Sequence, residues 1–372
     1  MIGVAADGWL PEAWNGGWTY RDRVPPALAG LLASAFYASC HGHSAQEVWR
    51  QRLCAGQIRR NGSLLREDQP LAAGDHLAWQ RPAWIEGAVP ATWQVVHDDG
   101  DLLVIDKPSG LPVLPAGGWL EHTALRLLER RHQGDPAGIP RPVHRLGRFT
   151  SGLLVCARRR QTRAWLSRQL RESTEAVSQW PGSTAHAASG GLVTAQASPD
   201  SAAVEAYGPA SSLARSPVSG SCRKSYRALL VPGVLALEPA ECLLLETAIG
   251  RRPHPRLGQI WCAADGSEPG DLPARSTLTL LERSPAADLV EVVIASGRPH
   301  QIRIQCAAIG APLLGDPLYL PGGGASADAR PGDGGYRLQA WRLEIERPAG
   351  AVLELEAPCP LRVEGAMPVP SD

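Results

Sequence analysis

A polar loop that leads directly into an apolar run is the feature that most constrains this chain. Residues 142–151 carry charges, hydroxyls and a glycine, and residues 152–157 are almost wholly apolar. A short apolar run predicts a buried strand, and a loop feeding such a strand can hold reactive groups at the floor of a cleft. His144 and Arg145 could bind an anion there, while Thr150 and Ser151 offer hydroxyl groups.

Size and composition indicate a globular protein of two or three domains. The 372 residues can bury a substantial core, because domains usually run to about 100 to 200 residues. Lys plus Arg equals Asp plus Glu at 37 each, so no overall positive charge points to a nucleic-acid partner. A basic face can still coexist with acidic surface elsewhere.

The eight cysteines form no metal-binding pattern. The sequence has no C-x-x-C pair and no Cys/His cluster, so we expect no metal site. Several of these cysteines lie in apolar runs, where a reduced thiol packs as a small hydrophobe. The sequence shows no signal peptide and no apolar run near the ~18 residues that a membrane span needs. We therefore expect a cytoplasmic protein without a membrane partner.

The first part of the chain predicts a small module over 20–84. Helices are expected near 28–37 and 45–55, followed by a hairpin whose turn is Asn61-Gly62. Residues 1–18 show no clear period, and 82–91 read as a linker. Arginines of the second helix and the hairpin, Arg59 and Arg60 among them, suit either a solvated surface or contacts with phosphates.

A larger domain is expected over 93–360. Strands flank an acidic turn near 95–105, and a basic helix over 159–171 follows the central strand. Residues 173–221 and 321–335 are rich in small and turn-forming residues, so both predict disordered insertions.

Four ordered motifs in this domain carry a resemblance. His144-Arg145-Leu146-Gly147 with Thr150-Ser151-Gly152 resembles the His-Arg-Leu-Asp-x-x-Thr-Ser-Gly signature of RluA-type RNA pseudouridine synthases. Residues 95–113, 224–228 and 297–303 are similar to further motifs of that family. The resemblance implies an α+β fold: a mixed, mostly antiparallel central sheet with flanking helices. It also implies that 20–84 is an alpha-L type RNA-binding module.

The resemblance assigns roles to individual residues. Its stacking ring falls on Tyr226, its pairing cation on Arg303, and its catalytic aspartate on Gly147. The other implied contacts with RNA or substrate are His144, Arg145, Thr150, Ser151, Arg298, His300, Gln301, Arg59 and Arg60. The implied partner is ribosomal or transfer RNA, whose uridine is flipped into the site. No cofactor, no metal and no obligate protein partner are expected.

Glycine at position 147 leaves several interpretations open. A glycine cannot attack a sugar or move a proton, and Arg303 would lose its expected partner. Asp106 and Asp316 are the nearest candidates for a replacement carboxylate, although neither looks purpose-made. The favoured hypothesis is an active pseudouridine synthase. The alternatives are a catalytically silent RNA-binding or assembly factor and, more distantly, a glycosidase-like enzyme, for which no paired carboxylates are evident.

Overall fold

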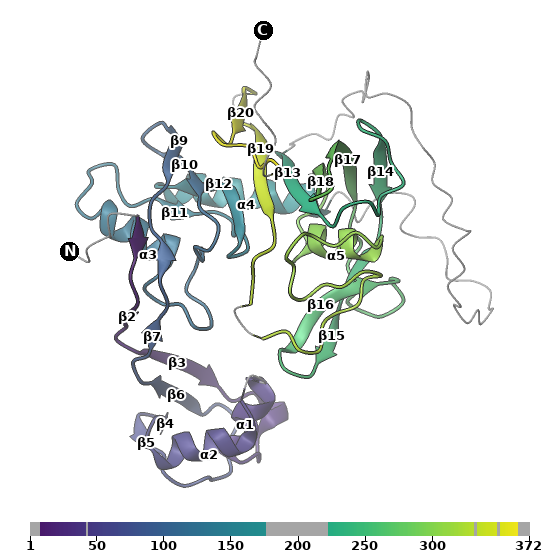
Figure 1. Ribbon diagram of the computed structural model, residues 1–372. Helices are drawn as coiled ribbons and strands as arrows, with labels where there is room; N and C mark the ends of the chain where they lie inside the picture. Colours follow the sequence, from purple (N-terminus) through teal and green to yellow (C-terminus); the bar gives the residue numbers. More distant parts are fainter. Residues whose placement is uncertain (1–7, 42–43, 176–221, 331–332, 348–349, 364–372) are drawn as a thin grey trace, which may run out of the picture.

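The computed structural model describes residues 8–41, 44–175, 222–330, 333–347 and 350–363. Figure 1 shows a small module beneath a larger body, which is built on a broad sheet. The module comprises the elements from β3 to β6, and the larger body contains the elements from β9 onward.

The small module packs two helices on a four-stranded sheet in the order β3-β6-β4-β5. The helix expected near 28–37 begins only at Ala33, because Pro26 opens a short 3-10 turn and Gly30 has φ +87°. Asn61 and Gly62 both have positive φ, as the turn of a two-residue hairpin requires. The elements are β3 (Trp18–Arg23), η1 (Pro26–Leu28), α1 (Ala33–Cys40), α2 (Gln46–Cys54), β4 (Ile58–Arg60), β5 (Ser63–Leu64) and β6 (His76–Arg81).

Short strands tie the segment expected as a linker to the N-terminal residues. β1 (Trp9–Leu10) pairs with β8 (Val89–Pro90), and β2 (Ala13–Trp14) pairs with β7 (Ile85–Glu86). The buried Glu86 carboxylate accepts hydrogen bonds from the backbone N–H groups of residues 120–122 and from the Asn15 amide. Burial would raise the pKa of Glu86, but these donors lower it. The linker is therefore fastened to the larger body.

A ten-stranded sheet forms the larger body. Its main path runs β14-β17-β18-β13-β19-β12-β10-β9, with β11 beside β12 and β20 beside β19. Every pair is antiparallel except β12 and β19, which run parallel. The strands are β9 (Gln94–Asp98), β10 (Leu102–Lys107), β11 (Arg141–Pro142), β12 (Thr150–Ala157), β13 (Cys222–Leu230), β14 (Cys242–Leu245), β17 (Ser276–Arg283), β18 (Asp288–Ile294), β19 (Leu338–Glu346) and β20 (Val352–Glu356).

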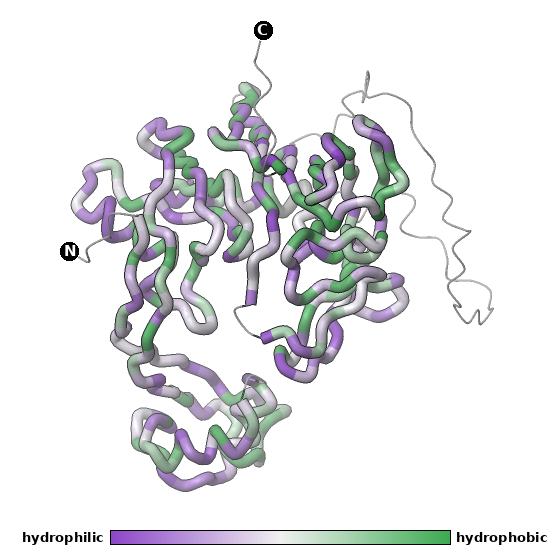
Figure 2. Tube along the Cα trace, viewed as in Figure 1, coloured by the Kyte–Doolittle hydropathy of each residue, from purple (hydrophilic) through white to green (hydrophobic). Residues whose placement is uncertain are grey.

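Helices and one hairpin complete this body. Figure 2 shows hydrophobic stretches interspersed with hydrophilic ones along the trace of both halves of this body. One core cluster lies around β10 and β12 and another around β13, β17 and β18, so each half of the sheet has its own apolar interior. The remaining elements are α3 (Ala124–Arg131), α4 (Arg160–Glu175), α5 (Gln301–Ala308), β15 (Ala248–His254) and β16 (Gly258–Ala264).

The two predicted insertions differ in outcome. Residues 173–175 end helix α4, and 176–221 lie outside the described residues. The prediction of disorder over 321–335 is wrong for 321–330 and 333–335, which the structure places against the domain. A bridge joins Tyr319 to Ala325, and Gly334 lies against the Phe149 ring. Small residues allow close packing in this segment. Composition alone does not distinguish such a segment from a disordered one.

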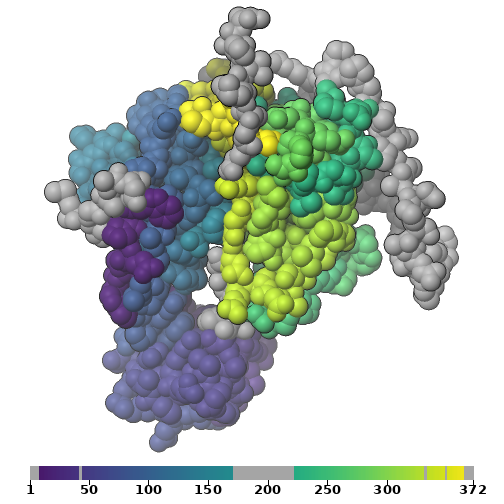
Figure 3. All heavy atoms as spheres, in the orientation of Figure 1, coloured from purple at the N-terminus to yellow at the C-terminus, as the bar shows by residue number. Residues whose placement is uncertain are grey.

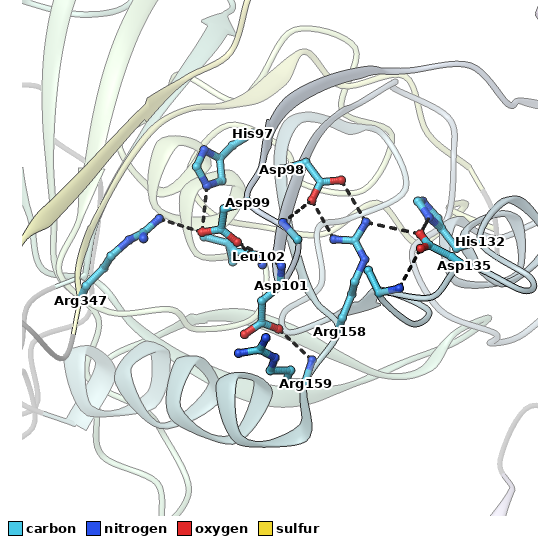
Figure 4. Close-up of polar contacts among 12 residues, drawn as sticks. His97, Asp98, Asp99, Asp101, Leu102, His132, Asp135, Arg158, Arg159 and Arg347 are labelled. Atoms are coloured by element: carbon cyan, nitrogen blue, oxygen red, sulfur yellow. Dashed lines mark hydrogen bonds and ion pairs between the residues drawn. The ribbon is translucent and has the colours of Figure 1, made fainter.

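The acidic turn between β9 and β10 fastens the end of the central strand (Figure 4). Arg158, whose side chain is 4% exposed, donates two hydrogen bonds to Asp98 at 2.8 and 2.9 Å. Asp101 accepts hydrogen bonds from the Arg159 N–H and the Thr162 hydroxyl at the start of α4. Asp98 raises the pKa of Arg158 against the effect of burial. These contacts hold β12 and α4 in one orientation.

Replacing Asp98 by alanine tests this network. Arg158 would stay buried without its two-point partner, so we expect the free energy of unfolding to fall by about 2 kcal/mol in denaturant titrations. Adding Arg158→Met should restore part of that loss, because the unpaired charge is removed. Equal losses in the single and double variants would contradict this account.

Candidate active site

The junction of the two sheet halves brings the polar loop over 142–151 and the Tyr226 strand together. β19 lies between them, and Ala340 is opposite both Gly152 of β12 and Tyr226 of β13. Two strand spacings therefore separate Gly152 from Tyr226, about 10 Å. A Cβ on Gly152 would lie 2.2 Å from the Ala340 carbonyl oxygen, so only glycine permits this close parallel pairing.

A turn over 147–150 presents the loop to the cavity. The Thr150 N–H donates to the Gly147 carbonyl at 3.0 Å, which closes the turn. Lys107, fully buried, donates to the carbonyl oxygens of Pro108, Leu111 and Arg148. Burial lowers the pKa of Lys107 to about 7, and the adjacent Asp106 acts in the opposite direction. The lysine thus has a structural role: it holds the turn on the loop that follows β10.

A cavity of about 680 Å³ opens at this junction. Its size suits a small-molecule or nucleotide site. In Figure 3, the yellow segment that leads into β19 lies between the blue half and the green half of the body. Among the described residues, the lining contains no Asp or Glu but five cations. The predicted residues that meet in it are His144, Arg145, Gly147, Thr150, Tyr226, Arg298, His300, Gln301 and Arg303.

Arg303 has its own carboxylate partner. The guanidinium Nε and Nη2 donate to the two oxygens of Asp316 at 2.6 and 2.7 Å. Burial alone would lower the pKa of Arg303, but Asp316 raises it. The expectation that Arg303 lacks a partner is therefore wrong. Asp316 compensates for the absent side chain at position 147 as far as charge is concerned.

Neither candidate carboxylate replaces the missing one in the cavity. The Asp316 side chain is 0% exposed and also accepts the N–H groups of Leu318 and Tyr319, so it supports Arg303 rather than facing a substrate. Asp106 lies on β10 and is not part of the cavity lining. Burial raises the pKa of Asp106.

The space beside Gly147 is occupied by Tyr336. An ideal Cβ on Gly147 would lie 2.3 Å from the Tyr336 Oη atom and 3.2 Å from the Thr150 hydroxyl. Tyr336 is 5% exposed and lines the cavity, and its hydroxyl is 3.4 Å from that of Thr150. A side chain at 147 and the Tyr336 hydroxyl cannot both fit here unless one of them moves, so the tyrosine in this position requires a glycine at 147.

Hydrogen bonds set the protonation of both histidines at the cavity. The Val155 N–H donates to His144 Nε2 at 3.0 Å, so the proton of the neutral ring lies on Nδ1. Tyr319 donates its hydroxyl to the Trp261 carbonyl, so it accepts from His300 Nδ1 at 2.7 Å. His300 thereby keeps Nε2 as an acceptor. Burial lowers the pKa of each histidine to about 4.

The remaining predicted residues either form hydrogen bonds within the domain or lie in the small module, away from the cavity. The buried Gln301 amide bonds to Ser296, Ser276 and backbone groups, so it stiffens the start of α5. Ser151 is next to the cavity lining, and its hydroxyl is 3.5 Å from the Leu338 carbonyl. Arg59 and Arg60 lie in the small module. Arg60 pairs with Asp75 at 2.6 Å, whereas Arg59 bonds to Gln80 and to the Gly62 carbonyl.

The lining also contains Lys224, Tyr336 and Arg342, which the sequence analysis did not assign to the site. Lys224 was visible as part of the Lys-x-Tyr motif. Burial lowers the pKa of Lys224. Tyr336 directly follows the stretch that was expected to be disordered, and no local pattern marks it or Arg342. The pairing of β19 with β12 and β13 is what brings them to the cavity.

Comparisons with known proteins identify the family of this chain. A family model described as RNA pseudouridylate synthase matches residues 101–178. An uncharacterized RNA pseudouridine synthase of Synechocystis sp. is 37% identical over 328 residues, which cover 87% of this chain and 93% of the relative. The chain belongs to the RNA pseudouridine synthase family. The resemblance drawn from its motifs is confirmed at that level.

Other members of the RNA pseudouridine synthase family match as well. RNA pseudouridine synthase 5 of Arabidopsis thaliana is 32% identical and covers 93% of this chain and 94% of its own length. Ribosomal large subunit pseudouridine synthase D of Nitrosomonas europaea is 29% identical over 72% of this chain and 62% of its own. A solved human protein, RNA Pseudouridylate Synthase Domain Containing 1, has a TM-score of 0.45 at 22% identity over 72% of this chain and 84% of that one.

No three or more His, Cys, Asp or Glu side chains among the described residues gather in a way that could hold a metal ion. No helix in the described ranges has the length and apolar character needed to cross a membrane.

Gly147→Ala tests the contact between position 147 and Tyr336. The added methyl would meet the Tyr336 hydroxyl, so we expect the free energy of unfolding to fall by about 1 to 3 kcal/mol in denaturant titrations. Adding Tyr336→Phe removes that oxygen and should recover most of the loss. Simple addition of the two single effects would show that the side chains do not compete for space.

The neutral histidines predict a pH dependence of stability. His144 has a pKa of about 4 in the folded protein and 6.5 as its ordinary value, so the unfolded chain binds the proton first as pH falls. We expect the stability present above pH 6.5 to be lost progressively between about pH 6.5 and pH 4. His144→Gln should reduce this slope, with the remainder due in part to His300. If urea titrations gave the same dependence of stability on pH for the wild type and for His144→Gln across this range, His144 would be excluded as its source.

Proposed function

We propose that this chain isomerises specific uridines to pseudouridine in structured RNA, ribosomal or transfer RNA. The observation that carries the proposal is the convergence of His144, Tyr226 and Arg303 on one cavity at the sheet junction. These residues come from three separate sequence motifs. Their meeting matches the family membership established by the relatives.

The charge of the cavity supports an RNA substrate. Its lining combines five cations with no carboxylate among the described residues. Such a site attracts phosphates, and arginine offers a planar fork that suits them. The overall charge balance of the chain hides this local excess. The lining cations are Arg145, Lys224, Arg298, Arg303 and Arg342.

The reaction requires the uridine to leave its helix and turn within the site. The enzyme must break the N1–C1′ bond, rotate the base and join C5 to C1′, so the nucleotide is flipped out at a cost of a few kcal/mol. We assign Tyr226 to stack on the uracil ring. We assign His300 Nε2, which is an acceptor at the cavity, to the base N3–H. Arg303, held in place by Asp316, orients the charged part of the substrate.

The small module supports a second contact with RNA. Its fold of two helices and a hairpin fits the expected alpha-L type module, and Arg59 extends from the hairpin. Arg60 is held by Asp75, so we propose that it shapes the hairpin.

All eight cysteines are free thiols. We propose a reducing compartment, such as the cytoplasm, for this protein.

Mapping of pseudouridine tests the proposal directly. Total RNA from cells with and without the gene should differ at one or a few uridines, and the purified protein should modify the same positions in RNA from the deletion cells. RNA binding without any modified site would instead favour the catalytically silent alternative.

Tyr226→Leu tests the stacking assignment. Loss of a ring that stacks on the base should lower kcat/KM by about 5- to 150-fold, because such stacking contributes about 1 to 3 kcal/mol per base. Tyr226→Phe keeps the ring and serves as the matched control. Equal losses in both variants would show that the hydroxyl, rather than the stacked ring, is what matters.

A further inference from the structure

The cavity needs a proton-transfer group that position 147 does not supply. Among the described lining residues, the side chains able to exchange a proton are His144, Lys224, Tyr226, His300 and Tyr336. His300 already donates Nδ1–H to Tyr319, and burial raises the pKa of Tyr226, which keeps that phenol protonated. Of these side chains, Tyr336 is the one whose ionisable group lies against the position of a Cβ on Gly147.

The Tyr336 hydroxyl occupies the volume of a side chain at 147. Its Oη lies 2.3 Å from an ideal Cβ on Gly147, so this oxygen lies within the space that a carboxylate side chain at 147 would take. Thr150 lies beside it at 3.4 Å between the two hydroxyl oxygens. In this position the phenol faces the same cavity that Tyr226 lines from the neighbouring strand.

Arg303 lies over the Tyr336 ring. The central guanidinium carbon is 4.2 Å from the ring centroid, and Asp316 accepts hydrogen bonds from Nε and Nη2 of the same group. A cation on the face of an aromatic ring attracts its electrons and offsets negative charge that develops on its oxygen. The arginine to which the resemblance assigned the pairing with a carboxylate lies here over the ring of a phenol.

Close backbone packing fixes the tyrosine in place. A Cβ on Gly334 would lie 1.6 Å from the Phe149 ring, and Gly335 has φ +126°, a conformation that other residues rarely adopt. A Cβ on Gly315 would come within 2.9 Å of the Gly335 carbonyl oxygen. Three glycines thus let the strand entering β19 press Tyr336 against the turn that holds Gly147.

We propose that Tyr336 is the catalytic residue that transfers the proton in this site, in place of a carboxylate at position 147. This inference rests on the proposed pseudouridine synthesis. It explains why a glycine and a tyrosine occur together here. It also assigns a role to the stretch before β19 that composition alone suggested to be disordered.

The proposed proton transfer is balanced. The ionised Tyr336 oxygen takes the proton from ribose C2′, the C2′–H electrons form a C1′=C2′ bond, and uracil leaves with the N1–C1′ electrons. After the base turns, C5 attacks C1′ while the Tyr336 phenol returns its proton to C2′. The proton on C5 then moves to N1. The product is an isomer of the substrate, and Tyr336 ends in its starting form.

A cycle of variants on the RNA identified by mapping tests the proposal. Tyr336→Phe removes only the hydroxyl, and we expect kcat to fall by about 100-fold or more with an unchanged thermal midpoint. Gly147→Asp alone should also be slow, because the carboxylate meets the tyrosine hydroxyl. Gly147→Asp combined with Tyr336→Phe should recover at least about tenfold over Tyr336→Phe. A double variant that stays as slow as Tyr336→Phe would overturn the equivalence of the two groups.

The pH profile of kcat gives a second readout. Because a phenol and a carboxylic acid ionise in different pH ranges, the pH profile of kcat should differ between the wild type and the double variant. Tyr336→Phe with more than half of wild-type kcat, or identical pH profiles of the wild type and the double variant, would overturn the role of Tyr336. A wild type that modifies no RNA would instead overturn the proposed function.

Discussion

The parallel pairing of β12 with β19 is the constraint on which the rest of the molecule depends. Among the residues that the structure describes, it is the one parallel contact in the ten-stranded sheet, and it joins two halves that each have their own apolar core. Gly152 permits the strands to approach at Ala340. Because the site residues lie on both halves, this contact decides their separation. The cavity forms where the two cores meet and neither fills the space.

Buried charges around the site are balanced locally, which leaves the cavity itself positive. Asp316 neutralises Arg303 from behind, Asp98 does the same for Arg158, and three carbonyl oxygens solvate Lys107. Buried cations are tolerated only with such partners. These carboxylates bind buried arginines and do not line the cavity, so the cations of the lining remain available to a phosphate-bearing substrate. A neutral composition and a basic site are therefore compatible.

Much of the fold was predictable from the sequence because its signals are local. The Asn61-Gly62 turn, the apolar run after Gly152 and the strand at Tyr226 each follow from neighbouring residues. Helix α1 began later than expected because Pro26 and Gly30 interrupt the apolar pattern. The N-terminal strands escaped prediction because two-residue strands have no period to detect. The stretch before β19 was misjudged because glycines that allow close packing resemble those of a flexible loop.

The sequence by itself determined the family, the order of the motifs and most residues of the candidate site, because the chemistry of each motif is written in adjacent residues. Only the tertiary structure decided that Asp316 pairs with Arg303, that Asp106 lies outside the cavity and that Tyr336 occupies the space beside Gly147. These contacts join residues far apart in the chain, at distances set by strand pairing and packing. No local pattern encodes them, since each depends on where a second segment comes to rest.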